Sequence, residues 1–133
     1  VPKLSEAPQM KTILLVDDSV TMLKSLQTAL EISGFRVATA ADGVSALQQL
    51  KSGLRPDLII TDINMPHMDG LTFIKHARQH LRFTPILALT TEGQRAKRDE
   101  AKQLGATGWI LKPAIGTDLI KTIQHVMPML AAA

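Results

Sequence analysis

The sequence predicts a three-layer α/β domain, in which a doubly wound, five-stranded parallel sheet lies between two layers of helices. Three observations lead to this prediction. Five short apolar runs occur along the chain, helical patterns separate them in strict alternation, and the runs themselves show little polar–apolar alternation. Strands that are apolar throughout are buried on both faces, as in a parallel sheet covered by helices. The crossovers between such strands are right-handed, and 133 residues suit one domain of this kind.

The five apolar runs have the length and the flanking turn residues of buried strands. The predicted strands are Ile13–Val16, Phe35–Ala40, Leu58–Ile60, Ile86–Leu89 and Trp109–Leu111.

The segments between the runs repeat apolar residues at helical spacing, and most of them end near a glycine or a proline. The predicted helices are Val20–Ser33, Gly43–Ser52, Leu71–His80, Gln94–Leu104 and Thr117–Met127. We expect one domain over residues 11–128, with a flexible N-terminal segment (1–10) and a C-terminal tail (129–133).

The composition excludes several classes of protein. Hydrophobic residues make up 45% of the chain and charged residues 20%, as in ordinary globular proteins. The absence of cysteine excludes a disulfide scaffold and a cysteine-ligated metal, and it fits a reducing compartment. No apolar run approaches the length of a membrane span, and the first nine residues lack the apolar core of a signal peptide. We therefore expect a cytoplasmic protein that does not bind membranes.

The charged residues are unevenly divided among the residue types. Fifteen Lys and Arg outnumber twelve acids, and eight of these acids are aspartate. A basic excess can indicate nucleic-acid binding, but aromatic residues are only 3% of the chain and no helix-turn-helix pattern occurs. We expect no nucleic-acid partner. Aspartate favours caps, turns and ligand positions, so the places of these aspartates matter.

Polar residues that suit phosphoryl chemistry follow four of the five runs. Asp17 and Asp18 come after the first run, Asp62 after the third, Thr90 after the fourth and Lys112 after the fifth. Ligands of open α/β sheets bind beyond the carboxyl ends of the strands. Three carboxylates gathered there repel one another unless a cation such as Mg²⁺ compensates, and a lysine suits a phosphoryl group. The set matches the needs of in-line phosphoryl transfer to a carboxylate.

Each of these residues also has a simpler interpretation when it is taken alone. Asp17-Asp18-Ser19 has the pattern of a turn and a helix N-cap, Asp62 that of a turn former, and Lys112 that of a solvated lysine. The combination at four strand ends favours the phosphoryl site.

Other sites and enzyme classes fit less well. An aspartyl phosphatase often has a second aspartate two residues after its nucleophile, where this chain has Asn64. A flavodoxin needs a phosphate-binding loop after the first strand, where Asp17 and Asp18 would repel phosphate. His76 and His80 have the spacing of a shared metal site, but no third ligand is near in sequence.

From about Lys11 to Met127 the sequence resembles the receiver domains of two-component response regulators, and in particular the CheY-type stand-alone chemotaxis regulators. The stretches that carry the resemblance are Leu14–Ser19, Asp62–Gly70, Leu89-Thr90 and Leu111-Lys112-Pro113. The resemblance implies a flavodoxin-like sheet with the strand order 2-1-3-4-5 and a monomer.

The resemblance also implies roles for single residues. Asp62 would be the phosphoacceptor, taking a phosphoryl group from a phosphohistidine of a sensor histidine kinase. Asp18 would be a direct Mg²⁺ ligand and Asp17 would act mostly through water. Asp62 and the backbone carbonyl of Asn64 would complete the protein's share of the metal ligands.

Two further residues would contact the phosphoryl group. Thr90 would hydrogen-bond to it and move toward it after phosphorylation, and Lys112 would pair with one of its oxygens. The Lys112–Pro113 bond is expected to be cis. The chain would thus catalyse its own phosphorylation and dephosphorylation while acting mainly as a switch. The polar residues Asn64 and Glu92, two positions past Asp62 and Thr90, predict a short-lived aspartyl phosphate.

The resemblance leaves the output open in two respects. Trp109 stands where the family usually has a tyrosine or phenylalanine that turns inward as the threonine moves. The larger indole either stays outward on a binding surface or packs as a strand residue against the last helix. The expected output partner is a flagellar motor switch protein. The alternatives are a phosphate sink, a kinase-bound adaptor and a phosphorelay intermediate that passes its phosphate to a second histidine protein.

Overall fold

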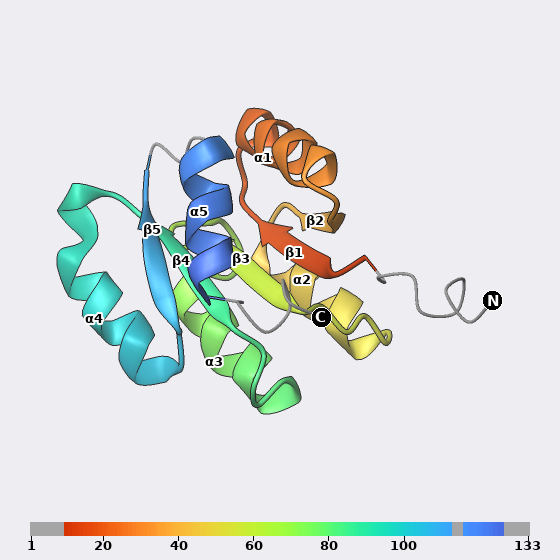
Figure 1. The fold of residues 1–133 in the computed structure, drawn as a ribbon. Helices are drawn as coiled ribbons and strands as arrows, with labels where there is room; N and C mark the ends of the chain where they lie inside the picture. The colour runs from red at the N-terminus through yellow and green to blue at the C-terminus, as the bar shows by residue number, and fades with distance from the viewer. Residues whose placement is uncertain (1–9, 113–115, 127–133) are drawn as a thin grey trace.

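A computed structural model describes residues 10–112 and 116–126 of the chain. The sheet has the order β2-β1-β3-β4-β5, and all of its strands are parallel (Figure 1). Both the predicted fold class and the implied strand order are therefore confirmed. The strands are β1 (Thr12–Val16), β2 (Arg36–Ala40), β3 (Leu58–Asp62), β4 (Ile86–Thr90) and β5 (Gly108–Leu111).

Helices alternate with the strands along the chain. They are α1 (Val20–Ile32), α2 (Gly43–Lys51), α3 (Gly70–His80), α4 (Arg95–Leu104) and α5 (Gly116–Val126). A short 3₁₀ turn at Glu92–Gln94 precedes α4. The expected end of the last helix at Met127 and the expected cis bond to Pro113 lie outside the described residues. The division into residues 1–10, 11–128 and 129–133 stays a prediction.

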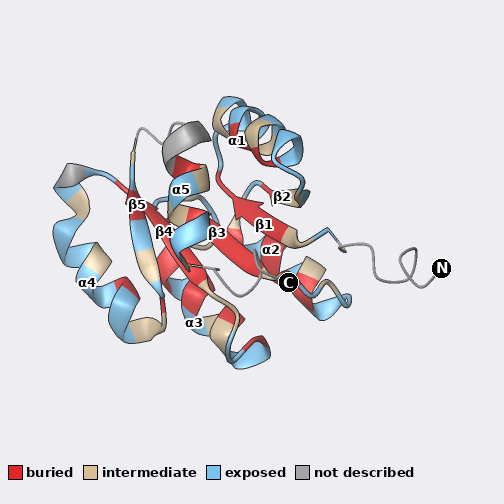
Figure 2. Ribbon diagram, in the orientation of Figure 1, coloured by how far each residue is buried: buried red, intermediate tan, exposed pale blue. Residues whose placement is uncertain are grey.

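The strands send alternate side chains into two separate apolar cores. In β1, Ile13 and Leu15 pack with α1 and α5, whereas Leu14 and Val16 pack with α2, α3 and α4. Figure 2 shows the consequence: the inner strands β1, β3 and β4 are almost entirely buried, the edge strands β2 and β5 are only partly buried, and the helices are buried mainly on their sheet-facing side. No helix among the described residues is long and apolar enough to cross a membrane.

Three helices that begin at the carboxyl end of the sheet carry a capping side chain. Ser19 Oγ accepts from Met22 N at 3.2 Å, so the interpretation of Asp17-Asp18-Ser19 as a cap is correct for its serine. Asp42 and Asp69 cap α2 and α3 in the same way. Each cap satisfies a free backbone N–H and holds the helix start beside the strand ends. The loops between these strands and helices are thereby fixed around one edge.

Gly70 lets the loop after β3 close back onto its own strand. The Gly70 N–H donates to the carbonyl oxygen of Ile63 at 2.7 Å. A Cβ at this position would collide with the carbonyl oxygen of Asp62 and with Cα of Ile63. Only glycine fits such a close approach of two backbone segments without displacing one of them.

The opposite, amino end of the sheet is joined by side chains that bond to backbone. Arg78, near the end of α3, donates to the carbonyl oxygens of Leu81, Arg82 and Thr84 at 2.8–3.0 Å. It also donates to Gly105 O, after α4, at 2.6 Å. One guanidinium thus ties together the segments that lead into β4 and β5.

Candidate functional site

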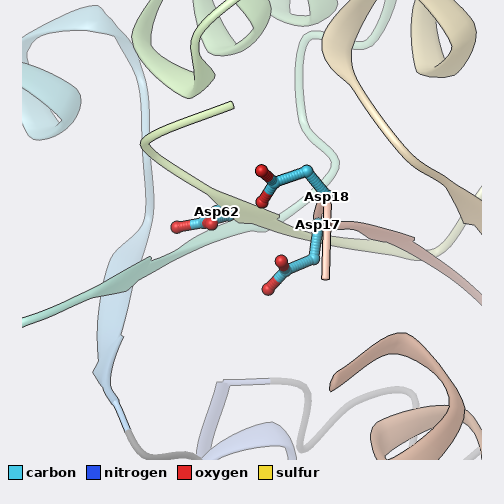
Figure 3. A group of neighbouring side chains, drawn as sticks. All are labelled: Asp17, Asp18 and Asp62. Carbon is cyan, nitrogen blue, oxygen red and sulfur yellow. The ribbon is translucent and has the colours of Figure 1, made fainter. Parts of the chain in front are cut away.

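Three carboxylates gather at the carboxyl ends of β1 and β3. One oxygen from each of Asp17, Asp18 and Asp62 lies within 4.8 Å of the others. Figure 3 shows Asp17 and Asp18 beside the end of β1 and Asp62 at the end of β3. Asp17 and Asp62 are buried and Asp18 is exposed. Among the described residues, this is the only trio of His, Cys, Asp or Glu side chains close enough to share a metal ion.

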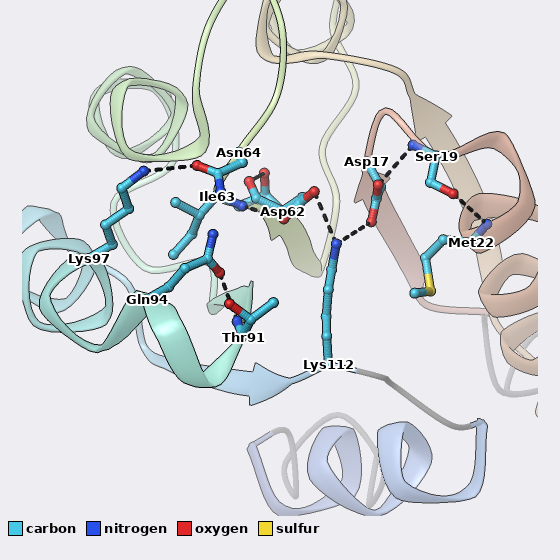
Figure 4. A network of polar contacts seen from close by, with 11 residues as sticks. Asp17, Ser19, Met22, Asp62, Ile63, Asn64, Thr91, Gln94, Lys97 and Lys112 are labelled. Atoms are coloured by element: carbon cyan, nitrogen blue, oxygen red, sulfur yellow. Dashed lines mark hydrogen bonds and ion pairs between the residues drawn. The ribbon is translucent and has the colours of Figure 1, made fainter.

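Lys112, just past the end of β5, reaches between two of these acids. Its Nζ lies 3.1 Å from Oδ2 of Asp62 and 3.4 Å from Oδ2 of Asp17 (Figure 4). The lysine side chain is only 21% exposed, so both ion pairs are largely shielded from solvent. The other oxygen of Asp62, Oδ1, accepts from the Ile63 N–H at 2.8 Å, which fixes the orientation of the carboxylate.

Burial and mutual charge shift the protonation equilibria of this group. Burial raises the pKa of Asp17, and the charge of Asp62 raises it further, against the lowering effects of the Ser19 N–H and Lys112. Burial alone would lower the pKa of Lys112, but the hydrogen bond and charge of Asp62, together with Asp17, outweigh it and raise the pKa. The surroundings therefore favour the protonated ammonium of Lys112, and they disfavour the ionised form of the Asp17 carboxyl.

Two buried oxygens at this edge have no hydrogen-bond partner among the described residues. They are Oγ1 of Thr90 and Oδ2 of Asp17, although the latter keeps the 3.4 Å ion pair with Lys112. Thr90 ends β4 and is fully buried, and its backbone carbonyl accepts from Lys112 N. Buried polar atoms are rarely left unpaired. An acceptor on Asp17 suits a hard cation, and a hydroxyl on Thr90 suits a phosphoryl oxygen, so the residues present fit both groups.

The rim of the site is formed by the start of α4 and the loop after β3. The exposed Asn64 accepts from Lys97 of α4, whose Nζ lies 2.9 Å from Oδ1. Beside it, Thr91 N donates to Oε1 of Gln94 at 2.7 Å, closing a capping box before α4 (Figure 4).

Trp109 lies on the edge strand β5 and is 44% exposed. The guanidinium carbon of Arg98, on α4, lies 4.9 Å from the centre of the indole. This is a cation–π contact, so the tryptophan is covered by α4 while much of its surface faces solvent. A role of Trp109 as a switch stays a prediction.

The structure brings together Asp17, Asp18, Asp62, Thr90 and Lys112, as the strand ends predicted. Sequence reasoning missed the contacts of Lys97 and Arg98, two of the basic residues of α4. Their partners are distant in sequence, and no spacing or motif marks the contacts. His76 and His80 both line a hollow between α2 and α3, without a third ligand for a metal among the described residues.

A 2-1-3-4-5 parallel sheet with an acidic group at its strand ends defines a doubly wound α/β domain of the flavodoxin-like, CheY-type class. The chain belongs to the response regulator receiver domain family, whose model matches residues 13–124. Membership of this family implies phosphorylation-based two-component signalling and interaction with a histidine kinase.

Similar proteins include both single-domain and longer regulators. The structure of the chemotaxis response regulator CheY4 of Vibrio cholerae is 44% identical and superposes with a TM-score of 0.83, covering 90% of this chain and 100% of that one. The chemotaxis protein CheY-3 of Vibrio cholerae is 36% identical over 121 residues, which are 89% of this chain and 92% of that protein. The transcriptional regulatory protein PrrA of Mycobacterium tuberculosis is 34% identical over 86% of this chain, but the match spans only 49% of that protein.

Proposed function

We propose that the chain accepts a phosphoryl group on Asp62 from a phosphohistidine of a sensor histidine kinase. The observation that carries the proposal is the buried group at the carboxyl end of the sheet. In it, Lys112 lies 3.1 Å from the Asp62 carboxylate beside Asp17, and the hydroxyl of Thr90 has no partner among the described residues.

In the proposed reaction a carboxylate oxygen of Asp62 bonds to phosphorus. The phosphorus–nitrogen bond of the donor breaks, and its electron pair returns to the imidazole. The Ile63 N–H holds Asp62 in place for this attack. Lys112 and the Thr90 hydroxyl bind the charge on the transferred oxygens, which is the main task in phosphoryl transfer.

We further propose that Asp17, Asp18, Asp62 and the backbone carbonyl of Asn64 hold Mg²⁺. The ion would neutralise charge between the acids and the phosphoryl oxygens. The raised pKa of Asp17, whose Oδ2 has no hydrogen bond beyond the 3.4 Å ion pair with Lys112, supports a site that needs a cation.

The chemistry is tested by intact-mass spectrometry after incubation with a small phosphodonor, acetyl phosphate, and Mg²⁺. The wild-type chain should gain the mass of one phosphoryl group, and Asp62→Asn should gain none. Asp99→Asn, the same chemical change at an exposed position of α4, serves as the control and should behave as wild type. Stoichiometric phosphorylation of Asp62→Asn would show that the acceptor is elsewhere.

For the output, we propose a phosphorylation-dependent change in affinity for a chemotaxis partner, the flagellar motor switch protein. The similarity to CheY4 and CheY-3, which extends over nearly their whole length, supports this choice. The proposal includes a monomer in the cytoplasm. The phosphate sink, the kinase-bound adaptor and the phosphorelay intermediate are the alternatives. The similarity to half of PrrA supports a further candidate, the receiver part of a transcriptional regulator.

A pull-down with and without the phosphoryl mimic beryllofluoride and Mg²⁺, combined with an assay of phosphate loss and transfer, distinguishes the motor, sink, adaptor and relay roles. Capture of motor switch protein that increases with the mimic supports the motor role. A chain that loses phosphate without binding the motor protein is a sink. Binding to the kinase that the mimic leaves unchanged indicates an adaptor. Transfer of phosphate to a second histidine protein indicates a relay.

A further inference from the structure

A contact between α4 and the loop after β3 lies at the rim of the proposed phosphoryl site. Lys97, the third residue of α4, donates from Nζ to Oδ1 of Asn64 at 2.9 Å (Figure 4). The two residues are 33 positions apart in sequence, and Asn64 is two residues past Asp62. The contact therefore joins a surface helix directly to the loop that follows the proposed phosphoacceptor.

The contact decides which half of the Asn64 amide is available to other groups. A lysine ammonium has donors only, so it selects the amide oxygen, and that oxygen is the acceptor of the side chain. The oxygen keeps a second lone pair, but Lys97 fixes its position, and the NH₂ group at the other end of the amide can only donate. Asn64 is thus held with its acceptor turned to α4.

An acceptor near Asp62 matters for loss of the phosphoryl group. In hydrolysis a water oxygen bonds to phosphorus and the bond from phosphorus to the Asp62 oxygen breaks. Its electron pair returns to the carboxylate, and orthophosphate leaves with both protons of the water. A side-chain oxygen that accepts a hydrogen bond from this water orients it for attack, whereas an NH₂ group does not.

We infer that Lys97 is a positioning residue that prolongs the aspartyl phosphate by keeping the Asn64 oxygen away from the attacking water. The inference rests on the proposed function of Asp62. It also revises the short phosphate lifetime expected from the polar character of Asn64, because that expectation treats both ends of the amide as free. The lifetime is then set partly by α4, a helix outside the acidic group.

The test is the decay of the aspartyl phosphate after removal of the phosphodonor in excess Mg²⁺. Lys97→Met should shorten the lifetime about fivefold, the net scale of one ordinary hydrogen bond. Lys97→Arg, which keeps a cationic donor, should restore most of the lifetime. Lys102→Met makes the same chemical change on the same helix away from Asn64 and should match wild type.

Two further measurements separate positioning from a general effect of charge or folding. In an Asn64→Ala background, Lys97→Met should have no further effect on the lifetime, since the positioned group is gone. In the metal-free, unphosphorylated protein, Lys97→Met should shift the side-chain NH₂ resonances of Asn64 in ¹H–¹⁵N spectra, and Lys102→Met should not.

Equal lifetimes of wild type and Lys97→Met would overturn the inference, and so would an equal shortening in the Asn64→Ala background. In both cases Asp62 would still take phosphate, and the proposed function would stand. A wild-type chain that takes no phosphate at all would overturn the proposed function and this inference with it.

Discussion

The two ends of the sheet differ in how completely their polar groups are hydrogen-bonded. At the amino end, Arg78 donates to four backbone carbonyls, and Oδ2 of Asp57 accepts from Thr12 N at 2.8 Å. At the carboxyl end, Asp17 and Asp62 share one lysine, and the buried hydroxyl of Thr90 has no hydrogen-bond partner among the described residues.

Within this one small domain, the amino end of the sheet contributes mainly to stability and the carboxyl end mainly to function. Satisfied hydrogen bonds at the amino end hold the strand starts together. Repelling acids and an unpaired hydroxyl at the carboxyl end lower stability, and such groups persist where a ligand supplies the missing partners. Substitutions at the amino end should therefore mainly lower stability, and substitutions at the carboxyl end should mainly change the chemistry of the site.

The largest effect on stability is expected at Arg78. Arg78→Met leaves four carbonyls without their charged donor and should lower the free energy of unfolding by about 3 kcal/mol. Chemical denaturation measures the loss, and Arg82→Met, an exposed neighbour, is the control. A loss no larger than that of Arg82→Met would contradict the structural role of the amino end.

Gly70→Ala tests the link between the loop after β3 and Asp62. The added Cβ collides with backbone at Asp62 and Ile63, so the substitution should cost about 2 kcal/mol and slow phosphorylation by acetyl phosphate. Gly93→Ala is the control, because a Cβ there meets only Thr91 Oγ1 at an ordinary contact distance of 3.9 Å. Unchanged phosphorylation in a destabilised Gly70→Ala would show that the close approach serves folding alone.

Asp17→Asn should stabilise the metal-free protein at neutral pH by about 1 kcal/mol. Because the folded-state pKa of Asp17 is raised, the folded chain holds this proton more tightly than the unfolded chain. Ionisation therefore costs stability above that pKa. The advantage of Asp17→Asn should fade as pH falls through the raised pKa toward the ordinary value of 3.8.

Excess Mg²⁺ should make the wild-type protein more stable than Asp17→Asn, because the variant lacks one carboxylate ligand for the ion. Thermal denaturation across pH, with and without Mg²⁺, measures both effects, and Asp99→Asn is the control. A wild-type protein more stable than Asp17→Asn in the absence of metal would show that Lys112 fully compensates the acids.

The smallest effect is expected at the α4–β5 contact, away from both ends. Arg98→Gln removes the cation from the Trp109 ring and should cost at most about 1 kcal/mol. The fluorescence of Trp109, the only tryptophan, should shift to longer wavelength as the indole loses its cover. Arg95→Gln on the same helix is the control. Unchanged emission in Arg98→Gln would mean that the cation–π contact does not persist in solution.

The sequence allowed the fold and most of the site to be predicted, for one physical reason. A parallel sheet needs strands that are apolar throughout, and the polar residue after each strand must then lie at one edge. Asp62, Thr90 and Lys112 could therefore be brought together without knowledge of any contact. The strand order itself required the family resemblance.

Other contacts could not be predicted from the sequence. The hydrogen bonds from Lys97 to Asn64 and from Arg78 to Gly105 span 33 and 27 positions of the sequence. A surface helix carries several basic residues, and nothing in the sequence tells which of them makes such a bond. The collision that requires Gly70 arises from backbone geometry alone. The roles of Asp18 as a direct metal ligand and of Trp109 as a switch stay predictions.

The contrast between the two ends can be tested most directly by ¹H–¹⁵N spectra of the wild-type chain, recorded with beryllofluoride and Mg²⁺ added separately and together. We predict large shifts at Asp62, Thr90 and Lys112 only when both are present, with little change at Thr12, Arg78 and Gly105. Shifts that are equal at the two ends, or no shift at Asp62, Thr90 and Lys112, would contradict a phosphoryl site at the carboxyl end of the sheet.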